Sequence, residues 1–251
     1  MKILGLTGGI ASGKSTVSKM LLSKNKPNCK VAHIDADQLS RDVVQKGEPG
    51  LKKIVKQFGK KVLTSEGTLN REVLGSIIFN DSQKRKQLNK IVHPLVIKRM
   101  YNQLFVNLIK GTELVILDVP LLIEVGLNRF VHQTLLVYVD KDTQIQRLIQ
   151  RNELTNEQAL SRVNSQMELV KKKDYCNFVI DNSGSREQTQ KQVDRFFNEF
   201  VLKKTQTVSM WKKSKSKSYL PPPFVFSRVI LFLLLLFVFG LIFYFVFKII
   251  I

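Results

Sequence analysis

The chain has 251 residues and a formal net charge of +20, and its length suits one α/β domain with an appendage and a buried core. Its basic residues are spread along the whole sequence and form no nucleic-acid recognition motif, so we expect no nucleic-acid partner. Anionic small ligands and an anionic membrane surface account for the charge as well. The two cysteines, Cys29 and Cys176, lack metal-ligand spacing and indicate no disulfide framework, which fits a reducing compartment.

A glycine-rich motif lies close to the N-terminus. Its residues Gly8, Gly13, Lys14 and Ser15 have the spacing G-x-x-x-x-G-K-[ST] of a phosphate-binding loop. The glycines allow a tight turn and a close approach to an anion, and the backbone amides at the start of the next helix favour negative charge. Lys14 would neutralise the β- and γ-phosphates of ATP, and the Ser15 hydroxyl would bind Mg²⁺.

The segments on either side of the motif have the required order of strand, loop and helix. Residues 2–6 form a short apolar run typical of a buried parallel strand, and residues 15–24 show helical spacing. The motif therefore predicts that the chain binds ATP and Mg²⁺. The predicted nucleotide-binding residues of the loop are Gly8, Gly9, Ile10, Ala11, Ser12, Gly13, Lys14, Ser15 and Thr16.

A second predicted strand over residues 31–35 leads into two acidic residues. Asp35 and Asp37 would lie at the carboxyl edge of a parallel sheet, above the nucleotide. Such a carboxylate could accept a proton from an attacking hydroxyl or hold Mg²⁺ through water. The alternative is an aspartate that caps a helix over residues 38–45. His33 lies inside the strand pattern, where we expect it to pack rather than react.

The residues LTGGIASGKST at the start, and IDAD after one helix, make the chain resemble the dephospho-CoA kinase family over about residues 1–204. That family transfers the γ-phosphoryl group of ATP to the ribose 3′-hydroxyl of dephospho-CoA, which is the last step of coenzyme A synthesis. The resemblance favours Asp37 as the catalytic base, beside Lys14 as a catalytic cation. It also implies that Thr7 and Asp35 are substrate-binding residues.

Two predicted helical segments would form the region that embraces the acceptor. A segment similar to residues 66–79 begins this region in the family, so the resemblance implies that Arg71 contacts a substrate phosphate. As a lone arginine it could equally be a surface charge. Residues 83–108 predict a long helix interrupted at His93 and Pro94. The family carries a similar His-Pro, which points to the acceptor pocket; the alternative is that Pro94 opens a second helix, with His93 packed before it.

A third predicted strand over residues 114–118 ends in Asp118. This is the pattern of a Walker B strand, whose acid holds Mg²⁺ through water. The residues that follow, Pro-Leu-Leu-Ile-Glu at 120–124, resemble a signature of the family. Because the family varies at the position of Asp118, we expect that residue to have a supporting part.

Residues 134–139 are a predicted fourth strand, and the helical patterns after it carry several arginines. A basic flap that closes over the phosphates supplies positive charge where negative charge grows in the transition state. The family has a lid here, with arginines that match Arg147, Arg151 and Arg162. The resemblance implies that Arg147 is a catalytic phosphate contact and that Arg151 binds substrate. The alternative is a solvated helical face.

A fifth predicted strand over residues 177–180 is followed by the loop 181–184, with the sequence Asp-Asn-Ser-Gly. The family places a loop of this pattern against the adenine, so the resemblance implies that Asn182 and Gly184 bind the nucleotide. An amphipathic pattern over residues 185–201 predicts the last helix of the domain.

The C-terminal part of the chain differs in composition. Residues 205–223 are rich in Ser, Lys and Pro and predict a linker, and residues 224–251 predict a transmembrane tail anchor. Residues 229–247 contain no charged side chain and approach the ~20 residues needed to cross a bilayer. The basic flank favours the cytosolic side. We therefore expect a cytosol-facing domain on a membrane such as the mitochondrial outer membrane or the endoplasmic reticulum.

These patterns predict a three-layer α/β fold of the P-loop NTPase and kinase type. It has about five parallel strands, a helical acceptor region, a lid and a C-terminal transmembrane helix. We interpret the chain as a membrane-anchored, eukaryotic-type member of the dephospho-CoA kinase family, with a kinase domain over residues 1–204. Two alternatives stay open: a P-loop kinase for another small acceptor such as a nucleoside monophosphate, or a membrane-tethered nucleotide-binding protein whose catalysis has decayed. The sequence predicts no oligomeric state.

Overall fold

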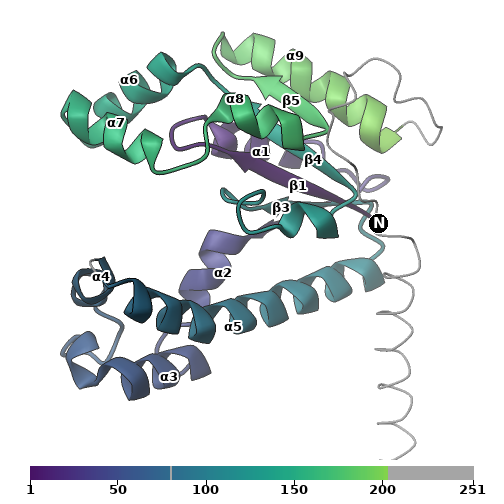
Figure 1. The fold of residues 1–251 in the computed structure, drawn as a ribbon. Helices are drawn as coiled ribbons and strands as arrows, with labels where there is room; N and C mark the ends of the chain where they lie inside the picture. Colours follow the sequence, from purple (N-terminus) through teal and green to yellow (C-terminus); the bar gives the residue numbers. More distant parts are fainter. Residues whose placement is uncertain (80, 203–251) are drawn as a thin grey trace, which may run out of the picture.

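The computed structural model describes residues 1–79 and 81–202, which build a parallel β-sheet between two layers of helices (Figure 1). In this part of the chain the sheet has five strands in the order β2-β3-β1-β4-β5, and all neighbouring strands are parallel. The strands are β1 (Lys2–Gly8), β2 (Val31–Asp35), β3 (Leu114–Asp118), β4 (Gln133–Tyr138) and β5 (Phe178–Asp181). The predicted three-layer fold with five parallel strands is confirmed.

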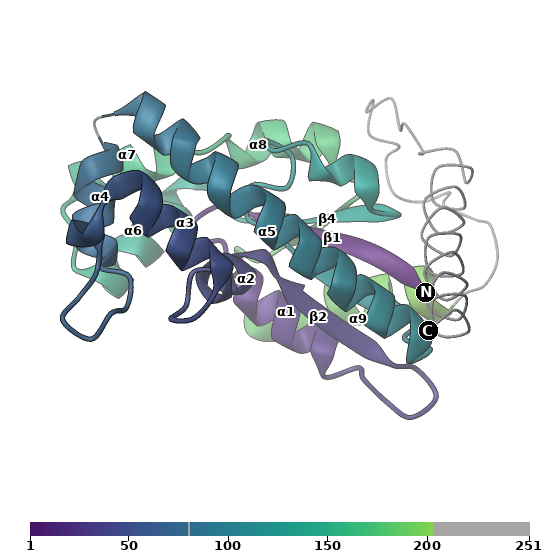
Figure 2. The same ribbon diagram turned by 90° about the horizontal axis from the view of Figure 1, so that it is seen from below.

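Helices cover both faces of the sheet, as Figures 1 and 2 show. Helices α1 and α9 lie on one face, and α2 and α5 lie on the other. The helices are α1 (Lys14–Leu22), α2 (Ala36–Asp42), α3 (Pro49–Phe58), α4 (Arg71–Phe79), α5 (Ser82–Ile109), α6 (Lys141–Asn152), α7 (Asn156–Asn164), α8 (Leu169–Lys172) and α9 (Arg186–Phe197).

The hydrophobic core occupies both faces of the sheet. On one face, Val17 and Leu21 of α1 and Phe196 of α9 pack with apolar side chains of the central strands. On the other face, Met100 and Leu104 of α5 join a cluster that includes side chains of β3 and β4. All five side chains are buried. Because burial of apolar surface is the main stabilising contribution to folding, this packing fixes α1, and the loop that precedes it, to the sheet.

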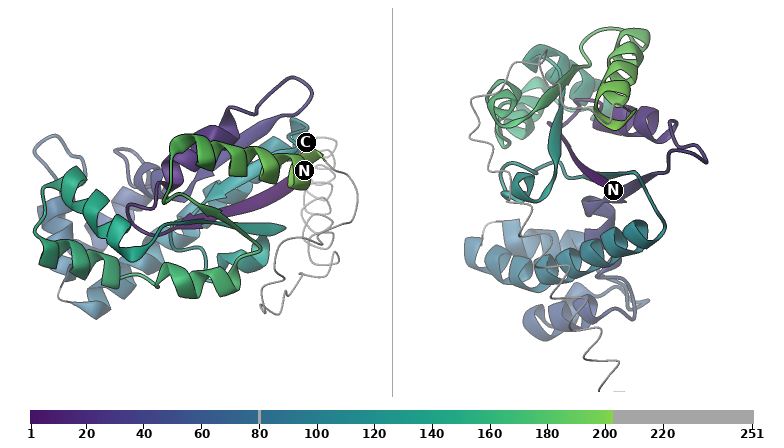
Figure 3. Two further views of the ribbon diagram at one scale, coloured as in Figure 1. Left: turned by 90° about the horizontal axis from the view of Figure 1, so that it is seen from above. Right: turned by 90° about the vertical axis from the view of Figure 1, so that its right-hand side faces the viewer.

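A third apolar cluster joins α3, α4 and α5 outside the sheet. Its buried members include Ile54 and Phe58 of α3 and Leu74 of α4. Figure 3 shows this helical region on the side of the molecule opposite to α9. The helical character that the sequence predicts for this region is confirmed.

Helix α5 runs without interruption through Pro94, which lies inside it. The predicted break at His93 and Pro94 is therefore wrong, and so is the alternative of a second helix that begins at Pro94. A proline removes one N–H bond and crowds the carbonyl one turn earlier, which strains a helix or bends it. Packing of α5 against α2, α3 and α4 outweighs this local penalty. His93 is exposed rather than packed.

The register of the strands brings three functional segments to one edge of the sheet. Leu6 of β1 pairs with Asp118 of β3, and Asp118 pairs in turn with Asp35 of β2. The carboxyl ends of these strands therefore lie side by side, where α1 and α2 begin. Open α/β sheets bind their ligands at this edge.

The predicted linker over residues 205–223 and the predicted tail anchor over residues 224–251 lie outside the described residues. The predicted domain boundary at residue 204 lies outside them too. Within residues 1–79 and 81–202, no helix combines the length and the apolar character that a membrane span requires.

Candidate active site

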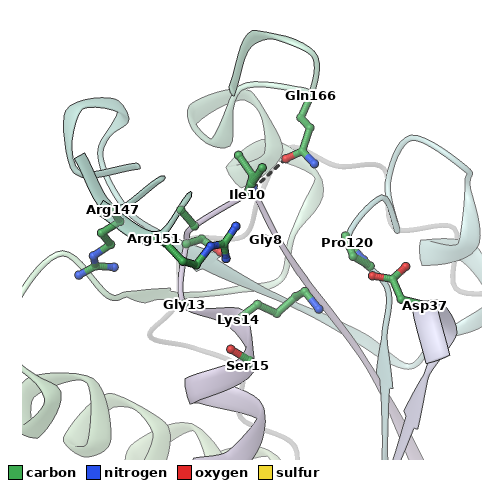
Figure 4. Close-up of a pocket in the computed structure, with 13 residues that line it drawn as sticks. Gly8, Ile10, Gly13, Lys14, Ser15, Asp37, Pro120, Arg147, Arg151 and Gln166 are labelled. Carbon is green, nitrogen blue, oxygen red and sulfur yellow. Dashed lines mark hydrogen bonds between the residues drawn. The ribbon is translucent and has the colours of Figure 1, made fainter. Parts of the chain in front are cut away.

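A pocket of about 460 Å³ surrounds the loop between β1 and α1 (Figure 4). It is lined by Gly8, Gly9, Ile10, Ala11, Ser12, Gly13, Lys14, Ser15, Asp37, Pro120, Arg147, Arg151 and Gln166. The structure thus brings the predicted phosphate loop, one predicted acid and two predicted lid arginines to the same cavity. Thr16 follows the loop in α1 and is not among the lining residues.

Gly13 shows why this loop needs glycine. Its φ of 83° lies in the left-handed region, and a Cβ at this position would lie 2.1 Å from Nδ2 of Asn182. Asn182 approaches this closely because its amide donates to the Ser12 carbonyl at 2.9 Å and accepts from the Thr189 hydroxyl at 2.9 Å. Asn182 therefore braces the loop without lining the pocket.

Lys14 forms an ion pair with Asp118 at the end of β3. Asp118 is 3% exposed, and its Oδ2 lies 3.2 Å from Nε2 of His33. The same ring nitrogen lies 3.1 Å from the Ser18 hydroxyl. Burial alone would raise the pKa of Asp118, but the hydrogen bond with His33 and the charge of Lys14 outweigh burial and hold the pKa below its ordinary value. His33 therefore does more than pack, because it links α1 to the Asp118 carboxylate; the expectation that it takes no part in the chemistry stays a prediction.

The start of α2 separates the roles of the two aspartates. Asp35 is the N-cap of α2 and accepts hydrogen bonds from the amides of Asp37 and Gln38 at 2.9 and 3.0 Å. The predicted capping role is confirmed for Asp35, although the helix begins earlier than the predicted range 38–45. Asp37 lines the pocket, where burial raises its pKa and the charge of Lys14 partly opposes that rise. A carboxyl group with a raised pKa in a pocket is a candidate general base.

Two arginines of α6 border the pocket on the side away from Asp37 (Figure 4). Arg151 points toward the phosphate loop, whereas Arg147 turns to Asn182 and donates to its carbonyl at 2.9 Å. Arg162 lies on α7, which packs against α6; it is exposed and does not line the pocket. Both arginines line the pocket, and which of them meets a phosphate stays a prediction.

Comparison with known proteins agrees with this geometry. Residues 2–188 match the family model described as dephospho-CoA kinase. A dephospho-CoA kinase of the bacterium Oceanobacillus iheyensis is 48% identical over 200 residues, which are 80% of this chain and 98% of that protein. The chain belongs to the dephospho-CoA kinase family.

Two further proteins resemble the chain over most of its length. The dephospho-CoA kinase domain-containing protein of Danio rerio is 47% identical over 196 residues, which are 78% of this chain and 83% of that protein. The crystal structure of TT1252 from Thermus thermophilus has a TM-score of 0.66 at 29% identity, and the match covers 79% of this chain and 97% of that chain. Because bacterial and animal proteins match at similar identity, the comparisons do not support the narrower expectation of a membrane-anchored member of eukaryotic type.

Several residues that the resemblance to dephospho-CoA kinases singled out do not line the pocket. Thr7 is fully buried and donates to the Pro120 carbonyl at 2.8 Å, so it supports the segment after β3. Arg71 is exposed at the start of α4, and His93 is exposed on α5. Gly184 precedes the N-cap of α9. Contacts of these residues with a substrate or nucleotide stay predictions.

Three residues at this dephospho-CoA kinase site were missed by sequence reasoning. Pro120 and Gln166 line the pocket, and the buried side chain of Gln144 contacts the phosphate loop from α6. For Pro120 a signal was present, since it opens the segment 120–124 that resembles the family signature. A glutamine that acts on a segment more than 100 residues away leaves no local pattern in the sequence.

Proposed function

We propose that this chain transfers the γ-phosphoryl group of ATP to the ribose 3′-hydroxyl of dephospho-CoA, which yields ADP and coenzyme A. The observation that carries the proposal is the pocket in which the phosphate loop and Asp37 face each other (Figure 4). Direct phosphoryl transfer to an alcohol requires a phosphate cradle beside a group that accepts the alcohol proton. Membership of the dephospho-CoA kinase family supports dephospho-CoA as the acceptor.

In the proposed reaction, Asp37 orients the ribose hydroxyl and accepts its proton while the new O–P bond forms and the bond to ADP breaks. Lys14 leaves Asp118 and turns to the phosphates, where its charge stabilises the transition state. Arg151 and Arg147 add positive charge from the lid. Positioning and charge neutralisation supply most of the rate enhancement, so no covalent intermediate is needed.

The oxygens beside Lys14 fit Mg²⁺, which prefers hard oxygen ligands and is usually held by one or two protein side chains together with phosphates and water. Ser15 is exposed in the first turn of α1, and Asp118 carries a carboxylate that its neighbours keep ionised. We propose that Ser15 binds the ion directly and that Asp118 holds it through water. When bound, the ion neutralises charge on the β- and γ-phosphates.

The remaining predicted site residues divide between the two substrates. We propose Asn182 and Gly184 for the adenine side, because the Asn182 loop adjoins the phosphate loop and α6. Arg71 and His93 are exposed on the helical region and are proposed contacts of the acceptor. Thr7, which is buried, would act through Pro120. Asp35 would act by capping α2 and so placing the base.

We also propose that the kinase domain is held on a membrane and faces the cytosol. The uncharged residues 229–247 and the basic linker over 205–223 support this proposal. The mitochondrial outer membrane and the endoplasmic reticulum both fit. Alkaline extraction of cell membranes tests it: the full chain should stay in the pellet, and residues 1–204 should be soluble. Release of the full chain at high pH would contradict the proposed anchor.

Residues 1–204 suffice to test the reaction, because the matched 200 residues account for 98% of the bacterial relative. ADP release from Mg-ATP is followed with dephospho-CoA, AMP, CMP or no acceptor, and then with Asp37→Asn. We expect turnover with dephospho-CoA alone, lowered on the order of 10²- to 10⁴-fold in the variant. Turnover with another acceptor would discard the proposed substrate. ATP binding without turnover would favour a tethered nucleotide-binding protein.

A further inference from the structure

Two glutamine side chains hold the backbone of Ile10 in the middle of the phosphate loop. The Ile10 amide donates to Oε1 of Gln166 at 2.8 Å, the bond that Figure 4 marks with a dashed line. The Ile10 carbonyl accepts from Nε2 of Gln144 at 2.7 Å. Two successive peptide groups of the loop are therefore fixed by side chains from a distant part of the chain.

The residue after Ile10 shows why the loop needs this support. Ala11 has a φ of 57°, in the left-handed region that residues with a Cβ rarely adopt. Such a conformation persists when the surrounding structure over-determines it. The N–H and C=O of a trans peptide point in opposite directions. Because the Ile10 carbonyl points to Gln144, the Ala11 amide in the same peptide group points away from Gln144. Ala11 lines the pocket, whereas Gln144 does not.

Gln144 is packed closely against the phosphate loop. Gln144 is 4% exposed, and a Cβ on Gly9 would lie 2.6 Å from its Nε2 and 3.2 Å from Leu169. Glycine at this position is therefore what lets the amide of Gln144 reach the loop. Gln144 belongs to α6, and Gln166 follows α7, so both bonds also connect the loop to the two lid helices.

We propose that Gln144 and Gln166 are positioning residues for phosphate binding. They fix the peptide groups on both sides of Ile10, so that the loop amides keep the orientation in which they meet the nucleotide phosphates. The inference rests on the proposed binding of ATP at this loop, but not on the identity of the acceptor. Neither glutamine has to touch the reacting atoms.

The main test uses Gln166→Met, which keeps the length of the side chain and removes the acceptor of the Ile10 amide. ADP affinity is measured by calorimetry on residues 1–204, beside the KM values for ATP and dephospho-CoA. We expect ADP affinity to fall about three- to tenfold, as the loss of one neutral hydrogen bond predicts. The KM for ATP should rise by a similar factor, and the KM for dephospho-CoA should stay unchanged.

Gln146→Met is the matched control, because it makes the same substitution at an exposed position of α6. It should leave all three quantities unchanged. A second variant, Gln144→Met, should weaken ADP binding too. The double variant should lose less than the product of the two single losses, because the two bonds hold adjoining peptide groups of the same short loop.

Unchanged ADP affinity in Gln166→Met would overturn the inference. A fall in kcat with both KM values constant would overturn it too, because a merely structural defect lowers the fraction of active protein without changing KM. Calorimetry with ADP separates this outcome from failure of the proposed function. If dephospho-CoA is not the acceptor, the parent protein shows no turnover with it, but the effect of Gln166→Met on ADP affinity still decides the inference.

Discussion

Lys14, which lines the candidate active site, forms an ion pair with the buried Asp118 at the end of β3. Asp118 is 3% exposed and is also hydrogen-bonded with His33, so its carboxylate is well stabilised in the ionised form. In the proposed reaction the phosphates of ATP replace Asp118 as the partner of Lys14. Nucleotide binding would then exchange one ion pair for another instead of creating a new one.

Asp118→Asn should make this exchange visible. Without the carboxylate, Lys14 is free to meet the phosphates, so we expect ADP to bind several-fold more tightly in the presence of EDTA. Turnover should need a higher Mg²⁺ concentration, because the carboxylate proposed to hold the ion through water has lost its charge. Calorimetry and a Mg²⁺ titration of kcat measure the two effects. Asp142→Asn, at an exposed position of α6, is the control; weaker ADP binding in Asp118→Asn would contradict the exchange.

The raised pKa of Asp37 predicts how its removal changes stability with pH. Its pKa in the folded protein lies above that in the unfolded chain, so the folded state disfavours the ionised group. This penalty is fully present at pH values above the folded pKa and is lost as the pH falls to the ordinary value for aspartate. Asp37→Asn should therefore raise the Tm at neutral pH, and the gain should shrink in acid. Activity of the parent should fall as the pH drops through the raised pKa, because a base must be ionised.

Asp140→Asn supplies the control of opposite sign. Hydrogen bonds from Thr143 lower the pKa of Asp140, so its ionised form stabilises the fold above the ordinary pKa of aspartate and loses this effect in acid. This variant should lower the Tm at neutral pH. Thermal melts from pH 4 to pH 8 compare both variants with the parent; parallel curves for the two would refute the assignment for Asp37.

Gly13→Ala should abolish the close contact between the loop and Asn182. Its φ of 83° strains any other residue, and the new Cβ would meet the Asn182 amide. Gly47→Ala is a matched control, because its φ is 92° and nothing lies within 4 Å of the new Cβ. Both variants should lose roughly 1–2 kcal/mol of unfolding free energy from backbone strain. Gly13→Ala should also weaken ADP binding by about tenfold or more, whereas equal ADP affinity in both variants would show that the contact is unimportant.

Lys172 is fully buried and forms an ion pair with Glu124 at 2.8 Å, while its ammonium also donates to the Pro120 carbonyl at 3.1 Å. Glu124→Gln leaves the fully buried ammonium of Lys172 without its charged partner and should lower the free energy of unfolding by about 3 kcal/mol. The double variant Lys172→Met/Glu124→Gln should lose less, because no unpaired charge remains buried. Urea unfolding measures both losses. Lys171→Met, whose ion pair is exposed, should change little; an equal loss there would contradict the role of burial.

The elements that depend on nearby residues could be predicted from the sequence. Strand β1, the glycine loop and α1 follow from an apolar run, a phosphate motif and helical spacing that are adjacent in the chain. The roles of Asp35 and Asp37 could not be separated in this way, because the choice depends on whether the strand continues or a helix starts between them. The structure starts α2 directly after Asp35, which makes Asp35 the cap and leaves Asp37 in the pocket.

The missed features depend on contacts between distant segments. Pro94 predicts a break when α5 is considered alone, but packing against three other helices keeps α5 whole. His33 has the pattern of a buried strand residue, and its contacts with Asp118 and Ser18 arise from the order of the strands and the position of α1. Gln166 lies 156 residues from Ile10, so its bond exists only in the folded chain.

The position of β1 in the sheet also determines which parts of the site open first. β1 is paired on both sides, with β3 and β4, whereas β2 is paired with β3 alone in the described sheet. Local unfolding starts where fewest interactions are lost, so amide hydrogen exchange should be slowest in β1 and faster in β2 and the first turn of α2. The phosphate loop is thus attached to the most protected strand, and Asp37 to an edge. We therefore expect local opening to displace Asp37 before the phosphate loop, so that phosphoryl transfer is lost before nucleotide binding.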